Sequence, residues 1–288
     1  MQTEEVIKGQ RYAVFAYLCW GFFPLYWKLL QHVPAIQILF HRVLWAGVFY
    51  ISYLFFIKRS NFSFEIFKDK ILVMLLASGL VTINWFVYIY AVTNNHVLDS
   101  SLGYFINPLV HALNGVIFLK EKLNRNKKIA FLFGAIGLLI LTYDLGHIPW
   151  IALSLAFSFA YYGFIKKQAN LSGFESCLFE ALFAIIPVFL IMNFWSSDWL
   201  DNHFQFSSLT WFYLIFGGIV TGLPLIWFTE AARRIPLNTL GLFQYISPSI
   251  QFCIGAFIFS ETISTWRWAG FICIWMGLIQ LIFKKNST

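Results

Sequence analysis

Long apolar stretches alternate with short clusters of charged residues along the whole chain of 288 residues. A helix that crosses a bilayer needs about 20 predominantly apolar residues, and the charged clusters and Pro, Gly and Asn breaks divide this chain into ten such segments. The expected membrane helices span residues 11–30, 35–57, 70–91, 99–119, 128–144, 149–166, 175–194, 209–231, 237–260 and 266–283. The loops between them are too short for a soluble domain. The pattern therefore predicts an all-α membrane protein with ten transmembrane helices.

The composition supports this class. The chain is 59% apolar, 20% aromatic and only 11% charged, whereas about 25% of the residues in soluble domains are charged. Its mean hydropathy is +0.71. The first ten residues, which include Glu4 and Glu5, do not resemble a cleavable signal, so the first helix is expected to stay in the protein.

The second half of the chain repeats the first at a shift of 140 residues. Pro108, Glu121 and Gly137 correspond to Pro248, Glu261 and Gly277. The shift predicts two repeats of five helices, residues 1–146 and 147–288, in one membrane domain. Because each repeat has an odd number of spans, the two are inverted relative to each other in the bilayer. This architecture is typical of secondary transporters.

The positive charges predict the orientation, because cytoplasmic loops retain Lys and Arg. Most of the 20 Lys and Arg residues, Lys166 and Lys167 among them, fall in the loops on one side. Only Lys28, Arg42 and Arg267 fall on the other. Both termini are therefore expected in the cytoplasm. Anionic lipid headgroups account for the net charge of +7, so the bilayer is the expected partner and a nucleic acid is not needed.

Two polar stripes related by the repeat are the strongest candidates for a site. One comprises Tyr104, Asn107, His111 and Asn114, which share one helix face; the other comprises Gln244, Ser247 and Gln251, with Tyr245 beside them. Both stripes are expected to line one central cavity, because unpaired polar groups in hydrocarbon are costly. The alternative is that they only join helices. Pro108 and Pro248 are predicted to bend their helices.

A charged residue lies deep in the second segment. Arg42, flanked by His41 and Trp45, is about 10 Å inside the expected span. It either meets water or an anion there or extends to the outer interface. Glu180 in the seventh segment is expected roughly 10 to 15 Å from Arg42 along the membrane normal, so a direct ion pair is not expected. The two charges could hold a zwitterion or operate two gates.

The third segment adds Asn84, Trp85 and Tyr88, and Trp45, Tyr104 and Tyr245 provide further aromatic surface. These rings could stack on a solute or bind a cation. Ser78 and Thr82, with the counterparts Gly218 and Gly222, are predicted to let helices approach closely. The four cysteines lack metal-ligand spacing, and no metal or cofactor is expected.

Four short motifs carry a resemblance to a known family. They are His41-Arg-Val-Leu-Trp45, Asn84-Trp85, Leu102-Gly-Tyr-Phe-Ile-Asn-Pro108 and Phe243-Gln-Tyr-Ile-Ser-Pro248. In this order they resemble RarD-type proteins of the EamA branch of the drug/metabolite transporter superfamily. The resemblance covers essentially the whole chain. It implies ten helices in two inverted halves, a bacterial inner-membrane location and transport of small organic solutes by alternating access.

Two transporter functions fit these observations. The first is a secondary carrier of a small organic metabolite, such as an amino acid or another carboxylate-bearing solute, in which Arg42 meets the carboxylate and His41, His111 or Glu180 takes up a coupling proton. The alternative is export of cationic drugs, with Glu180 or the aromatic walls dominant. An intramembrane enzyme is a remote third, because the spans lack metalloprotease and nucleophile-elbow motifs. A homodimer is compatible with the sequence.

Overall fold

The computed structural model describes residues 2–58, 68–93, 97–145, 150–195, 206–260 and 264–283, and every regular element among them is helical. The α-helices are α1 (Gln2–Lys28), α2 (Ala35–Tyr53), α3 (Ile71–Thr93), α4 (Val97–Leu119), α5 (Arg125–Leu145), α6 (Trp150–Ala169), α7 (Gly173–Trp195), α9 (Ser208–Arg234), α10 (Leu237–Gln244), α11 (Ile246–Cys253) and α12 (Thr265–Phe283). Two π-helical turns extend α2 and α11: η1 (Leu54–Lys58) and η3 (Ile254–Ile258).

Seven helical stretches among the described residues are long and apolar enough to cross a membrane. They come from α2, α3, α4, α5, α7, α9 and the α10–α11 segment. Helices α1, α6 and α12 are not among these seven stretches, so their crossing of the membrane remains a prediction from sequence. The first helix begins at Gln2 rather than near residue 11. The charged first turns of α1 contact the second half of the chain: Glu5 accepts a hydrogen bond of 2.9 Å from Arg234.

The segment predicted at 237–260 is broken in the middle. Helix α10 ends at Gln244 and α11 begins at Ile246. Pro248 lies four residues after Gln244 and has no N–H to donate to its carbonyl, so the regular hydrogen-bond ladder cannot continue there. The Tyr245 N–H instead bonds the Leu242 carbonyl, at 3.4 Å. In contrast, α4 is one assigned helix through Pro108.

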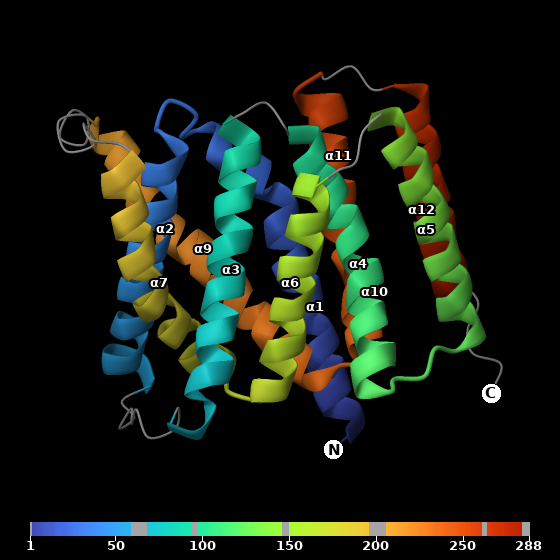
Figure 1. Ribbon diagram of the computed structural model, residues 1–288, viewed down its shortest axis with the longest axis horizontal. Helices are drawn as coiled ribbons and strands as arrows, with labels where there is room; N and C mark the ends of the chain where they lie inside the picture. Colours follow the sequence, from blue (N-terminus) through green and yellow to red (C-terminus); the bar gives the residue numbers. More distant parts are fainter. Residues whose placement is uncertain are drawn as a thin grey trace.

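The helices pack in pairs that the 140-residue shift relates to one another. Helix α4 packs on α6 as α11 packs on α1, α3 packs on α6 as α9 packs on α1, and α2 packs on α9 as α7 packs on α3. Figure 1 shows α2 and α7 at one edge of the molecule and α5 and α12 at the other, with the remaining helices between them. Helix α1 begins and α12 ends toward the same, lower end of that view.

Polar contacts hold the two sequence halves together at this lower end. Both oxygens of Glu121 accept backbone N–H groups at the start of α10, from Leu237 at 2.8 Å and from Asn238 at 3.0 Å. Lys127 donates to the Asn238 side chain at 2.5 Å and to Thr239 at 2.8 Å. A carboxylate at a helix N-terminus satisfies N–H groups that otherwise lack partners. The repeat counterpart, Glu261, lies outside the described residues.

The crossing of α2 and α9 depends on a glycine. A Cβ atom added to Gly218 would lie only 2.6 Å from the Trp45 carbonyl oxygen, and Gly222 lies one turn further along the same contact. This close approach is what the small-residue spacing predicted. The close approach of the two helices also lets Arg42 of α2, which is buried, hydrogen-bond Thr221 of α9.

The substitution Gly218→Ala is therefore expected to lower the free energy of unfolding by about 1–3 kcal/mol, because the new methyl group forces α2 and α9 apart. Gly79→Ala is the matched control, since no heavy atom lies within 4 Å of a Cβ built there. The melting temperatures of the two purified variants in detergent, compared with that of the wild type, measure these effects. Equal melting temperatures for the two variants would show that the α2–α9 contact is not as tight as described.

Candidate functional site

A cavity of about 70 Å³ lies at the centre of the helix bundle. This is well above the roughly 10–15 Å³ that one water molecule needs. Side chains from α1, α2, α3, α4, α6, α9, α10 and α11 enclose it. The lining residues are Tyr17, Trp20, Phe23, Arg42, Asn84, Trp85, Tyr88, Tyr104, Phe159, Thr221, Leu225, Gln244, Ser247, Pro248 and Gln251.

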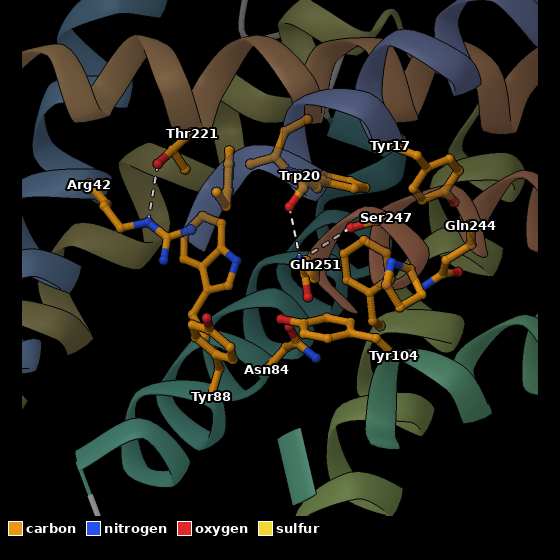
Figure 2. Close-up of a pocket in the computed structure, with 15 residues that line it drawn as sticks. Tyr17, Trp20, Arg42, Asn84, Tyr88, Tyr104, Thr221, Gln244, Ser247 and Gln251 are labelled. Atoms are coloured by element: carbon orange, nitrogen blue, oxygen red, sulfur yellow. Dashed lines mark hydrogen bonds between the residues drawn. The ribbon is translucent and has the colours of Figure 1, made fainter. Parts of the chain in front are cut away.

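Arg42 is the charged residue of this lining. It lies two turns into α2, which begins directly after Pro34, and only 7% of its surface is exposed. Its Nε atom donates to the hydroxyl of Thr221 at 3.1 Å. The guanidinium carbon lies 4.7 Å from the ring of Trp27 and 5.2 Å from the ring of Trp85. Figure 2 shows the side chain at one side of the cavity. This burial disfavours the alternative in which Arg42 extends to the interface.

The other predicted residues of the lining are neutral, and several are already hydrogen-bonded. Asn84 donates to the Leu155 carbonyl and to the Ser158 hydroxyl, each at 2.9 Å. Gln251 donates to the Trp20 carbonyl at 2.9 Å and to Ser247 at 3.3 Å. Trp85, Tyr88, Tyr104, Gln244 and Pro248 also line the cavity. The structure therefore brings together nine of the residues proposed from sequence.

The rest of the first polar stripe lies between helices instead. Asn107 donates to the Ala156 carbonyl at 2.9 Å and thereby joins α4 to α6. His111 is fully buried, with its ring centre 6.3 Å from that of Phe159 and 6.2 Å from that of Phe228. Asn114 is also buried and outside the lining. For Asn107 the hydrogen bond to α6 favours the helix-joining alternative. His111 and Asn114 are buried outside the lining, and no described residue hydrogen-bonds either ring nitrogen of His111 or the amide nitrogen of Asn114.

Four further candidates lie outside the lining of the central cavity. His41 and Trp45 interact with each other on α2, where the indole N–H donates to His41 Nδ1 at 3.0 Å. Tyr245, which joins α10 to α11, is buried with its ring centre 6.3 Å from that of Phe105 of α4 and its hydroxyl beside Gly134 of α5. Pro108 is likewise buried in α4, and its carbonyl faces Gly241 of α10.

Glu180 forms a separate charged cluster. Its carboxylate is ion-paired with Lys166 and accepts hydrogen bonds from Tyr162 at 2.9 Å and Ser176 at 3.3 Å. Lys166 was expected among the loop charges, but the structure buries it at 1% exposure. Lys166 lies in the last turn of α6 and faces α7, where the Glu180 carboxylate offsets its charge. As expected, Arg42 is not the ion-pair partner of Glu180.

A second, smaller cavity of about 10 Å³ adjoins Glu180. Trp85 and Leu225 line both cavities and separate the two charged sites. Glu180 is not among the residues that line the central cavity. Arg42 and Glu180 therefore line different cavities in the described part of the chain.

Six residues of the lining were not predicted from sequence: Tyr17, Trp20, Phe23, Phe159, Thr221 and Leu225. Five are aromatic or aliphatic, and in a chain with 20% aromatic residues no local signal separates those that line a cavity from those that face lipid. Thr221 corresponds to Val81 at the 140-residue shift, so the repeat does not mark it either. Only the crossing of α2 and α9 places its hydroxyl beside Arg42.

Chemically, the cavity combines one buried cation with aromatic walls and neutral hydrogen-bonding groups. No aspartate or glutamate is among the described residues that line it. An isolated buried charge is costly, and a bound anion would offset that cost through charge-assisted hydrogen bonds to the guanidinium. The site is therefore suited to an anion with an apolar body.

Comparison with known proteins gives consistent matches along the chain. The model of the EamA-like transporter family matches twice, over residues 7–143 and 148–283. The "Uncharacterized transporter YojE" of Bacillus subtilis is 42% identical over 99% of this chain and 97% of its own length. "Protein RarD" of Streptomyces exfoliatus is 38% identical over 97% of this chain and 90% of its own. A protein of known crystal structure, 16% identical, has the same fold, with a TM-score of 0.71 and coverage of 95% and 96%.

Proposed function

The chain belongs to the EamA-like transporter family, and we propose that it is a secondary active transporter that moves a small carboxylate-bearing organic solute by alternating access. It is a multi-pass protein of the bacterial inner membrane, surrounded by lipid, with a small molecule as its substrate. The observation that carries the proposal is the buried Arg42, which faces a central cavity whose described lining contains no acid.

The charge distribution favours an anion over a cation. A cationic solute in the cavity would be repelled by Arg42, and the buried acid Glu180 already pairs with Lys166 outside the lining. A carboxylate can instead accept two parallel hydrogen bonds from one guanidinium. An amino acid stays within the proposed class, provided that its ammonium group rests on the faces of rings such as Trp85 or Tyr104.

The repeat supports the alternating-access part of the proposal. The family model matches once in each half, and helix contacts recur in pairs related by the 140-residue shift. Transporters of this kind bind solute at the interface of two repeats and open to either side by moving one against the other. In the proposed cycle, the contacts of Glu121 and Lys127 with α10 close one end and break when that end opens.

The proposal is tested by comparing solutes of one shape and different charge. Phenylacetate, phenylacetamide and phenethylamine share a ring and a two-carbon chain, but they are anionic, neutral and cationic. The acid is expected to raise the melting temperature of the purified protein, since a ligand present at 100 times its Kd stabilises the folded state by about 2.7 kcal/mol. The amide and the amine are expected to have little effect.

Uptake of a binding acid into proteoliposomes without ATP then tests secondary transport. The expected result is accumulation driven by a solute or ion gradient alone. Stabilisation by the amine and not by the acid would contradict the carboxylate assignment and favour the export of cations.

A further inference from the structure

The side of the cavity opposite Arg42 carries polar atoms that no described residue hydrogen-bonds. Gln244 is 3% exposed and its Oε1 atom has no hydrogen-bond partner among the described residues. Tyr17 is fully buried, and its hydroxyl also has none there. Both residues line the cavity. Figure 2 shows them together on the side away from Arg42.

Unsatisfied buried polar groups are rare and costly, at about 1–3 kcal/mol each. The two groups here differ in what they require. A glutamine Oε1 accepts a hydrogen bond, and a tyrosine hydroxyl both donates and accepts. A solute group that fits both must carry a donor, and it benefits from an acceptor as well. Hydroxyl, phenol and amide groups meet this requirement.

A charged group fits this side poorly. The described lining offers a cation no carboxylate, and an anion would meet the acceptor Oε1 of Gln244. Between the two polar sides, Figure 2 shows the rings of Trp20 and Tyr104, with Asn84 and Gln251, which are already hydrogen-bonded to the protein, beside them. Such rings accommodate a flat apolar body. The cavity thus has a cationic side, a middle with aromatic rings and a neutral hydrogen-bonding side.

We infer that the transported solute is an anion with two polar ends: a carboxylate that meets Arg42 and, beyond a flat apolar body, a neutral hydrogen-bond donor that meets Gln244 and Tyr17. The inference rests on the proposed function and narrows its substrate class. It makes Gln244 and Tyr17 the residues that select among carboxylates, whereas Arg42 selects for the negative charge.

The experiment uses matched acids that differ by one hydroxyl. Benzoate, phenylacetate and 3-phenylpropanoate, each with and without a 4-hydroxyl group, vary the distance between the two ends. At the spacer length that fits, the hydroxyl is expected to lower the Kd of the wild-type protein by roughly 2- to 13-fold for each hydrogen bond formed. Calorimetric or thermal-shift titrations give the six Kd values.

The variants assign the effect to its residues. Gln244→Leu and Tyr17→Phe are each expected to reduce the preference for the hydroxylated acid, so that the ratio of the Kd of the plain acid to the Kd of the hydroxylated acid falls toward one. Tyr17→Phe removes only one oxygen, so it preserves the test if Gln244→Leu does not fold. Tyr245→Phe is the matched control, because the Tyr245 hydroxyl is also buried without a partner among the described residues but is outside the lining. It is expected to retain the full preference.

The outcomes separate the two proposals. Acids that bind equally well with and without the hydroxyl at every spacer length would overturn the two-ended solute and leave the carboxylate assignment intact. A preference retained in both Gln244→Leu and Tyr17→Phe would also overturn it. If none of the six acids binds, the proposed function itself fails.

Discussion

Replacing Arg42 by glutamine is expected to weaken the binding of carboxylates by about 10- to 150-fold, the equivalent of one hydrogen bond to a charged group. Arg42 is the cation of the cavity, and its partners there, Thr221 and the indole rings, are neutral. The ligand-free variant is expected to be at least as stable as the wild type, because the substitution removes a buried charge that no acid in the described lining offsets. The melting temperatures of the wild type and of Arg42→Gln are measured at increasing phenylacetate concentrations. The values without ligand compare stability, and the rise with concentration compares affinity.

Lys28→Gln is the matched control for Arg42→Gln. Lys28 is an exposed cation at the end of α1, with its Nζ atom 3.8 Å from the ring centre of Phe259 and outside the cavity lining. It is expected to leave carboxylate binding unchanged. Wild-type affinity in Arg42→Gln, or an equal loss in Lys28→Gln, would show that Arg42 does not bind the solute directly.

Replacing Glu180 by alanine is expected to destabilise the protein by about 3–5 kcal/mol. The substitution leaves Lys166 buried at 1% exposure without its counterion. It also removes the acceptor for Tyr162 and Ser176. The melting temperature in detergent is expected to fall by on the order of 10 °C.

The double variant Lys166→Met/Glu180→Leu is expected to recover most of that loss, because apolar residues of similar volume replace a buried ion pair at little cost. Glu5→Gln is the control for an exposed pair. Glu5 lies near Lys8 and Arg234 at the surface, where solvent screens the charges, and its substitution should change the melting temperature little. A Glu180→Ala variant as stable as Glu5→Gln would show that Lys166 and Glu180 are not the buried pair described.

Some features of the site were readable from sequence for physical reasons. A charge such as Arg42 inside an apolar segment is conspicuous because hydrocarbon does not tolerate it unpaired. The stripe of Gln244, Ser247 and Gln251 was recognised because it repeats the polar stripe of the first half at the 140-residue shift. A bend was predicted at both prolines because each lacks an N–H; the ninth segment breaks just before Pro248, whereas α4 continues as one helix through Pro108. These signals are local and need no knowledge of the neighbouring helices.

Other features depended on which helix faces which. The spacing of Asn107 and His111 is the same whether they face a cavity or another helix, and the fold places them against α6 and α10. From sequence, Lys166 was assigned to the loop charges, whereas in the fold it is buried and paired with Glu180 of α7. Tyr17 and Phe159 are ordinary aromatic residues until the packing of α1 and α6 turns them inward.

By itself, the sequence determined a helical chain of mostly apolar segments, its internal 140-residue duplication and a buried arginine, because hydrophobic length, repetition and the cost of charge in hydrocarbon are properties of the chain. Only the tertiary structure decided that Arg42 faces a central cavity whose described lining holds no acid, that Thr221 is its hydrogen-bond partner and that Glu180 pairs with Lys166. Those pairings arise from the crossing of helices distant in sequence, and the side-chain period of one helix fixes a face without fixing what that face meets.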